Sequence, residues 1–167
     1  MADSRDYPWL KVTFMLILVQ WTLALALPSG ESAWLKYVAI ALFAIWLPLE
    51  FLPFWHLKRY GEVPEGADYM STTRVVDRGI YAIVRHPQFV AWLFFSAGWM
   101  LITQHWASTL AGVAALTTEL LNIRDADKVC MRDLGPDYAR YRERVPLMNV
   151  AAGLWRKFGP GHTPVHG

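Results

Sequence analysis

The strongest chemical signal in the sequence is the triplet Arg85-His86-Pro87, which stands directly before a long apolar segment. Proline is favoured in the first turn of a helix, where the N–H that it lacks would have no partner. The sequence therefore predicts a helix that begins at Pro87, with Arg85 and His86 at its positive end. Such a helix terminus can bind a carboxylate or a phosphate. The simpler interpretation is that Arg85 only anchors the chain among lipid headgroups.

Acidic residues form a second group of candidates, at the end of a later apolar segment. Glu119, Ile123 and Asp127 are four residues apart, so they share one face of a helix. A carboxylate so close to hydrocarbon is costly and is usually paired or functional. We expect Glu119 either to be neutralised by Arg85 or Arg124 or to act in a reaction. For the segment 124–128, the alternative is an ordinary network of surface ion pairs, such as Asp125 with Arg124 and Lys128.

The composition places these candidates in a membrane protein. Hydrophobic residues make up 54% of the 167 residues, charged residues make up 18%, and the mean hydropathy is +0.22. These values exclude intrinsic disorder and are typical of a single membrane domain. A net charge of +2 argues against nucleic acid as a partner. The single cysteine, Cys130, cannot form a disulfide within the chain, and the histidines form no set of metal ligands.

Four apolar segments are long enough, or nearly long enough, to cross about 30 Å of hydrocarbon. They are residues 8–27, 34–57, 87–104 and 106–123, and we expect each to form a membrane-spanning helix. Lysine and arginine are concentrated after the second and fourth spans, so the positive-inside rule places both termini and the candidate site in the cytoplasm. A cleaved signal peptide is the alternative for the first span, because Ala24-Leu25-Ala26 resembles a cleavage site.

Polar segments connect and follow these spans. Residues 58–86 contain several glycines and prolines and are expected to be loop-like. The helix of the fourth span continues until Gly135-Pro136 ends it and starts another. Residues 137–145 then form a short amphipathic helix, and residues 159–167 form a flexible tail. The predicted fold is therefore all-α, a polytopic membrane protein with one integral-membrane domain, residues 1–158, and a cytoplasmic C-terminal helical segment.

Both candidate groups lie in blocks that resemble a known family, the integral-membrane methyltransferases of the isoprenylcysteine carboxyl methyltransferase and phospholipid methyltransferase type. Residues 79–89 read Gly-x-Tyr-x-x-x-Arg-His-Pro-x-Phe, which is similar to the family's first block. Arg124 and residues 134–146 resemble its second block, Arg-x-Glu-Glu followed by Gly-x-x-Tyr-x-x-Tyr-x-x-x-Val-Pro. The chain departs from the pattern in two places: the paired glutamates are replaced by alanine and Asp127, and Phe89 stands where the family has tyrosine.

The resemblance implies a cofactor, S-adenosylmethionine, held on the cytoplasmic face between residues 75–89 and residues 124–146. It implies cofactor-binding roles for seven residues: Gly79, Tyr81, His86, Phe89, Arg124, Asp127 and Tyr138. The candidate catalytic residues are Arg85, Asp127 and Glu119. Arg85 would orient a carboxylate acceptor, whereas Asp127 or Glu119 would take the proton from an amine. The methyl acceptor would be lipophilic, such as a prenylcysteine-like carboxylate, a phospholipid amine or a similar amphiphile among the membrane lipids.

Two other functions stay open at this point. An NADPH-dependent sterol-type membrane reductase has a similar C-terminal half, but the spacing from Arg124 to Gly135 is one position longer here, as in the methyltransferases. No Gly-x-Gly-x-x-Gly motif follows a strand, so a Rossmann cofactor domain is not expected. A non-enzymatic membrane scaffold would use the same residues only as anchors. A homodimer would help four helices to shield a lipid groove, but the sequence does not decide the oligomeric state.

Overall fold

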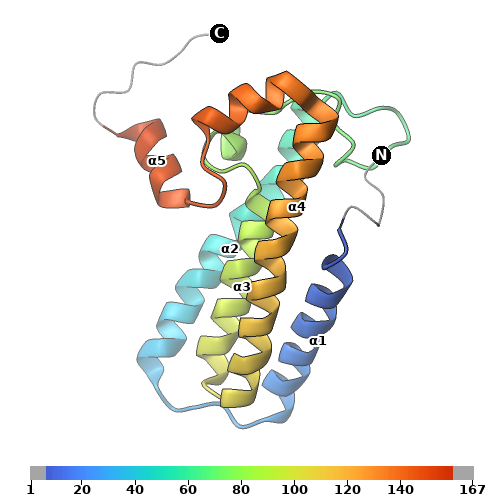
Figure 1. Ribbon diagram of the computed structural model, residues 1–167. Helices are drawn as coiled ribbons and strands as arrows, with labels where there is room; N and C mark the ends of the chain where they lie inside the picture. Colours follow the sequence, from blue (N-terminus) through green and yellow to red (C-terminus); the bar gives the residue numbers. More distant parts are fainter. Residues whose placement is uncertain (1–6, 160–167) are drawn as a thin grey trace.

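The computed structural model describes residues 7–159, and this part of the chain is helical without β-strands (Figure 1). Its elements are α1 (Leu10–Ala26), α2 (Ala33–Tyr60), the 3-10 helix η1 (Gly79–Ala82), α3 (Pro87–Thr103), α4 (Trp106–Arg144) and α5 (Val150–Phe158). Figure 1 shows α1, α2, α3 and the first part of α4 side by side as an elongated bundle. The predicted all-α fold is confirmed for the described residues, and the predicted flexible tail lies outside them apart from Gly159.

The four bundle helices coincide with the four predicted spans, but they differ in length and polarity. Among the described helices, only α2 is both long and apolar enough to cross a membrane. Helices α1 and α3 are apolar and have 17 residues each, which gives about 26 Å of helix. Helix α4 is long enough, but its apolar half contains Glu119 and Asn122. The helix positions are confirmed, whereas four membrane crossings stay a prediction.

The bundle carries apolar side chains on its outside and polar side chains within. Leu25 is 85% exposed and Phe51 is 63% exposed, whereas Gln20 and Asn122 are completely buried. A helix bundle in water has the opposite arrangement, with its apolar stripes turned inward. Extensive exposed apolar surface marks contact with a membrane or with another protein. The surface of this bundle therefore fits a lipid environment.

Hydrogen bonds between buried polar side chains join α1 to α3 and α4. Gln20 Nε2 donates to the Ser96 carbonyl at 2.9 Å, and the Ser96 hydroxyl donates back to Gln20 Oε1 at 2.9 Å. The Thr13 hydroxyl donates to the Thr118 hydroxyl at 2.8 Å, and Asn122 Nδ2 donates to Thr13 Oγ1 at 3.0 Å. Unpaired polar groups are costly in hydrocarbon, so bonds of this kind hold membrane helices together.

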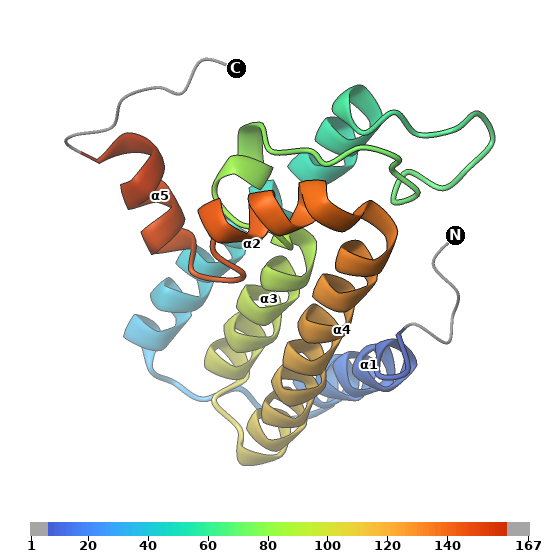
Figure 2. The same ribbon diagram turned by 45° about the horizontal axis from the view of Figure 1, so that its top comes forward.

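Two helix boundaries that glycine and proline predict are confirmed. Pro87 occupies the first position of α3. Gly135 interrupts α4 with a φ of 55° and a ψ of −132°, and the chain becomes helical again from Pro136. Figure 2 shows the part of α4 after this break turning away from the bundle and passing over the start of α3, beside η1. The break therefore places the end of α4 over the first turn of α3.

Candidate functional site

Four residues from the two predicted blocks meet in one buried group, which we call the Asp127 cluster: Arg85, His86, Asp127 and Tyr138. Arg85 Nη1 donates to Asp127 Oδ1 at 2.5 Å, and the Tyr138 hydroxyl donates to the same oxygen at 2.7 Å. His86 Nε2 lies 3.4 Å from that oxygen and 3.1 Å from the Tyr138 hydroxyl. All four residues are buried. One carboxylate oxygen thus connects an arginine, a histidine and a tyrosine.

The break in α4 brings Tyr138 to Asp127. In a continuous helix, the 11 positions between them would separate the two residues by about 16 Å along the axis. The non-helical backbone at Gly135 turns the chain so that the hydroxyl reaches the carboxylate. On the other side of the cluster, the backbone N–H of Arg85 donates to the Pro146 carbonyl at 3.2 Å. The two blocks are therefore joined by main-chain as well as side-chain bonds.

Burial and hydrogen bonding together determine the charges in the cluster. Burial alone would raise the pKa of Asp127, but hydrogen bonds from His86 and Tyr138 and the charge of Arg85 outweigh it and lower that pKa to about 2. Burial lowers the pKa of His86 despite the neighbouring carboxylate, so the imidazole is neutral at neutral pH. Burial and the bond to Asp127 hold the pKa of Tyr138 far above its usual value. Within the cluster, Arg85 and Asp127 therefore form an ion pair, and His86 and Tyr138 are neutral. A second arginine, Arg142, approaches the other Asp127 oxygen from outside the cluster, at 3.7 Å.

Aromatic side chains and η1 surround the cluster. The rings of Tyr138 and Tyr141 are 5.7 Å apart, and the Tyr141 hydroxyl donates to the Tyr81 carbonyl at 2.7 Å, which ties α4 to η1. Burial raises the pKa of Tyr81 well above its usual value, so this side chain also stays neutral. The ring of Phe89 lies edge-on to the His86 ring, with 6.1 Å between their centres. The predicted aromatic residues therefore lie in the cluster or directly beside it.

Gly79 has a packing role that goes beyond the predicted one. Its φ is +60°, a conformation that favours glycine, and an added Cβ would lie 1.8 Å from His56 Nε2. The His56 ring is itself held by a hydrogen bond of 2.8 Å between Nδ1 and the Leu52 carbonyl. The glycine therefore allows η1 to pack closely against the end of α2. A contact between Gly79 and the cofactor stays a prediction.

Glu119 and Arg124 lie outside the cluster. Glu119 is buried, and its Oε2 accepts a hydrogen bond of 3.1 Å from Asn122 Nδ2 on the same helix. The predicted pairing of Glu119 with Arg85 is wrong, because Arg85 pairs with Asp127 instead. Arg124 is exposed and forms no ion pair with a carboxylate of the described residues. A neutral amide on the same helix face, rather than an arginine, therefore satisfies the Glu119 side chain.

Helix α5 also contacts the first block, which was not predicted from the sequence. Lys157 Nζ donates to the Gly79 carbonyl at 3.2 Å. Gly153 lies so close to the end of η1 that an added Cβ would be 1.9 Å from the Ile83 carbonyl oxygen. The available signal was Asn149, because asparagine is a preferred residue at the start of a helix. Its side chain does cap α5 by accepting a backbone hydrogen bond of 2.9 Å.

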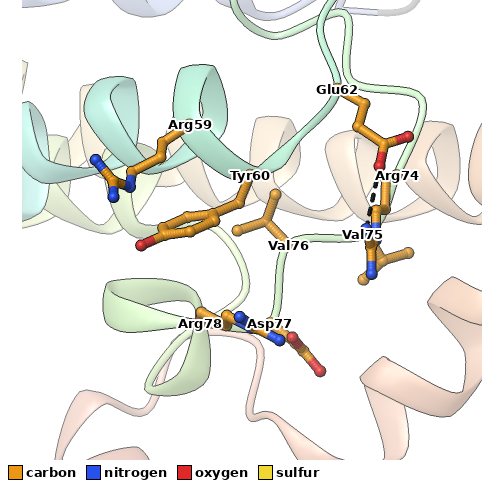
Figure 3. Close-up of a pocket in the computed structure, with 8 residues that line it drawn as sticks. All are labelled: Arg59, Tyr60, Glu62, Arg74, Val75, Val76, Asp77 and Arg78. Atoms are coloured by element: carbon orange, nitrogen blue, oxygen red, sulfur yellow. Dashed lines mark hydrogen bonds and ion pairs between the residues drawn. The ribbon is translucent and has the colours of Figure 1, made fainter. Parts of the chain in front are cut away.

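A cavity of about 190 Å³ lies between the end of α2 and the segment that precedes η1, and Figure 3 shows its lining residues in close-up. It is lined by residues from the end of α2 and from the following connection: Arg59, Tyr60, Glu62, Arg74, Val75, Val76, Asp77 and Arg78. Val75 also packs against the group formed by Tyr138, Tyr141 and Val145. The cavity therefore adjoins the site, although no residue of the Asp127 cluster lines it.

The cavity has an excess of positive charge. Arg74 pairs with Glu62 at 3.1 Å, the interaction drawn as a dashed line in Figure 3. Asp77 pairs at 3.5 Å with Arg144, which is outside the cavity. Both acidic residues of the lining are thus neutralised by arginine. The two remaining arginines, Arg59 and Arg78, form no ion pair with a described carboxylate.

The free hydrogen-bonding groups of the cluster fit a zwitterionic ligand such as the amino-acid part of S-adenosylmethionine. Arg85 Nε is buried and has no hydrogen-bond partner among the described residues, which leaves a donor for a carboxylate. Asp127 Oδ2 forms an ion pair with Arg142 Nε at 3.7 Å, which is too long for a hydrogen bond, so this oxygen can still accept a bond from an ammonium group. Among residues 7–159, no group of histidine, cysteine, aspartate and glutamate side chains could hold a metal ion.

The comparison with protein families gives one clear result. The model of the phospholipid methyltransferase family matches residues 34–133, which is more than half of the chain. The matched part includes α2, η1, α3 and most of α4, and with them Arg85, His86 and Asp127. Tyr138 and α5 lie beyond it. No curated protein and no solved structure matches the chain.

Proposed function

This chain belongs to the phospholipid methyltransferase family, and on that premise we propose that it methylates the headgroup amine of a phospholipid-type acceptor. As a member of the family it is a membrane protein and an S-adenosylmethionine-dependent methyltransferase. The membership favours methyl transfer over the sterol-type reductase and the scaffold. The observation that carries the proposal is the Asp127 cluster, in which polar side chains of the two blocks meet in one buried, hydrogen-bonded group.

The Asp127 cluster is the proposed binding site for the amino-acid part of the cofactor. Arg85 Nε and the positive end of α3 would hold its carboxylate, and Asp127 Oδ2 would accept a hydrogen bond from its amino group. When bound, S-adenosylmethionine supplies a methyl group on a positively charged sulfur. Tyr81, Phe89 and Tyr138 are neutral rings in or beside the cluster, and aromatic faces attract such a cation.

Asp127 is better suited to binding than to proton transfer. A carboxylate whose pKa is about 2 is too weak a base to remove the proton from an ammonium group efficiently. Glu119 has only the Asn122 amide as its partner and stays the candidate proton acceptor. It precedes Asp127 by eight residues, or about 12 Å of helix, on the side toward the middle of the bundle. A lipid amine that reaches down from the headgroup level would therefore lie between the two.

The positively charged cavity is the proposed site for the phosphate of the acceptor lipid. Arg59 and Arg78 have no acidic partner among the described residues and can form charge-assisted hydrogen bonds with phosphate oxygens. Arg59 also lies over the Trp55 ring, 5.2 Å from its centre, and tryptophan is typical of the membrane–water boundary. The cavity would thus hold the phosphate at the headgroup level, next to the cluster.

The proposed orientation places this end of the bundle in the cytoplasm. Lys58 and Arg59 form the basic last turn of α2, and eight further basic residues lie in the connection to η1 and in α4, where all of them lie at position 124 or beyond. Cytoplasmic segments near membrane spans carry an excess of such residues. With four crossings, both termini and the Asp127 cluster would then be on the cytoplasmic side.

Methyl transfer in defined vesicles tests the proposed function. The purified protein is reconstituted with phosphatidylethanolamine, and S-adenosylmethionine with an isotopically labelled methyl group is added. Mass spectrometry should then detect the label on the lipid headgroup nitrogen, and none when the donor is left out. A farnesylated cysteine analogue serves as the competing carboxylate acceptor. Label on this analogue but not on the phospholipid would contradict the proposed acceptor class.

A further inference from the structure

Helix α5 has apolar side chains on its outer face and polar side chains on its inner face. Ala151, Leu154, Trp155 and Phe158 recur at the spacing of one helix face, and all four are exposed. Trp155 is 72% exposed and Phe158 is 70% exposed. A surface helix in water turns its apolar stripe toward the protein. An apolar medium or an apolar partner must therefore cover the outer face of α5.

The inner face is held to η1 by polar groups. Arg156 donates a hydrogen bond to the Ala82 carbonyl, and Lys157 Nζ donates to the Gly79 carbonyl at 3.2 Å. Both basic side chains are half-buried. These bonds fix the rotation of α5 about its own axis, so the apolar residues have to point outward.

The start of α5 lies at the depth of the apolar part of the bundle. Val150 packs against the core group of Leu49, Val84, Val90 and Ala91. Ala91 is four residues beyond the start of α3, which is about 6 Å along the helix. Figure 1 shows α5 at the height of the upper part of the bundle and not beyond its end. Interfacial helices bury their apolar face about 5–10 Å into the boundary between headgroups and acyl chains, which is a similar depth.

We propose that α5 is an interfacial helix whose outer face, Ala151, Leu154, Trp155 and Phe158, inserts into the lipid bilayer at the site end of the bundle. Lipid is favoured over a second copy of the chain because α1 and α2 also carry exposed apolar side chains, such as Leu25 and Phe51, and a bilayer covers those and the outer face of α5 at once. Through its bonds to η1, α5 holds the first block of the site at the membrane surface. This proposal does not depend on the identity of the methyl acceptor.

Spin labels measure the insertion directly. Leu154→Cys, Trp155→Cys and Phe158→Cys are labelled with a nitroxide in Cys130→Ser protein, in vesicles of phosphatidylcholine with a minor fraction of phosphatidylglycerol. Oxygen concentrates in the acyl region, whereas a nickel chelate stays in water. We expect a higher oxygen-to-nickel accessibility ratio at all three positions than at the control Arg140→Cys, whose native side chain is 73% exposed on α4.

Two results of this measurement would overturn the proposal. Ratios equal to that of the Arg140→Cys control would place the outer face in water. Exclusion of both reagents, together with spin–spin broadening between labels, would assign the face to a second copy of the chain.

A second measurement leaves the partly buried Cys130 in place. The emission of Trp155 is obtained as the difference between wild-type protein and Trp155→Phe. We expect lipids with brominated acyl chains to quench this difference and aqueous iodide to leave it unchanged. Quenching by iodide alone would contradict the insertion of α5.

Discussion

Arg85 and Asp127 are 42 positions apart in the sequence and form a buried ion pair, with 2.5 Å between Nη1 and Oδ1. The pair connects the residue just before α3 to the middle of α4, so it forms only when these two helices pack together. Removal of one partner from such a pair leaves an uncompensated buried charge and typically costs about 3–5 kcal/mol. The same two residues therefore stabilise the site and determine its charge.

The acid sensitivity of the fold should depend on the Asp127 carboxylate. Its pKa in the folded protein is about 2, below the usual 3.8, so the ionised form stabilises the fold at pH values above about 4. This stabilisation, about 2 kcal/mol, is lost as the pH falls from about 4 to about 2. In detergent, the Tm of wild-type protein should fall over this pH range, and the Tm of Asp127→Asn should fall less. An equal decline in both proteins would exclude Asp127 as its origin.

An alanine at position 135 should misplace Tyr138. The backbone of Gly135, with φ 55° and ψ −132°, lies in a region that is almost restricted to glycine, and a side chain there costs about 1–3 kcal/mol. No atom lies near the added Cβ, so the effect comes from the backbone alone. We expect Gly135→Ala to lower both Tm and the affinity for S-adenosylmethionine.

Gly66→Ala is the matched control for this substitution, because Gly66 also has a positive φ, 77°, and open space around it. It should leave the cofactor affinity unchanged. If the two variants bind the cofactor equally well, the break in α4 does not position the site.

A side chain at Gly153 should separate α5 from η1. The Cβ of an alanine there would lie 1.9 Å from the Ile83 carbonyl oxygen, and a backbone atom cannot move aside easily. Overpacking of this kind typically costs about 1–3 kcal/mol. Amide hydrogen exchange of η1 should be faster in Gly153→Ala than in wild-type protein. Ala151→Val, on the exposed face of the same helix, should not change it, and unchanged exchange in both variants would speak against the packing of α5 on η1.

Substitution of the unpaired arginines of the cavity should weaken the binding of the phospholipid substrate. Arg59→Gln and Arg78→Gln each remove a donor for the phosphate, so KM for phosphatidylethanolamine should rise severalfold while kcat changes little. Lys58→Gln removes the same charge from the neighbouring residue, which does not line the cavity and lies over the Phe54 ring at 4.4 Å. An equal rise of KM in Lys58→Gln would show a general effect of surface charge instead.

The sequence was sufficient for those features that depend on neighbouring residues. Pro87 and Gly135 act on the backbone at their own positions, so a helix start and a helix break could be predicted there. The spacing of Glu119, Ile123 and Asp127 correctly placed all three on one buried face of α4. The triplet Arg85-His86-Pro87 could be recognised because its three residues are adjacent in the sequence.

Features that depend on distant segments could not be predicted in this way. The partner of Arg85 is set by the packing of α3 on α4, and nothing near Arg85 in the sequence distinguishes Asp127 from Glu119 as that partner. The contact between Gly153 and η1 requires the chain to return after the turn at the end of α4. Helix α5 itself had local signals, the capping residue Asn149 and the helical spacing of Leu154, Trp155 and Phe158, but no local signal shows that its apolar face points away from the protein.

Calorimetric titration of the detergent-purified protein with S-adenosylmethionine tests the central claim most directly. Asp127→Asn removes the charge of the cluster, whereas Asp125→Asn removes the same charge from a surface pair with Lys128, 2.7 Å apart, on the same helix. We expect wild-type protein and Asp125→Asn to bind the cofactor with similar affinity and Asp127→Asn to bind it at least about tenfold more weakly, a difference of about 1.4 kcal/mol. Equal binding by all three folded proteins would contradict the assignment of the Asp127 cluster as the cofactor site.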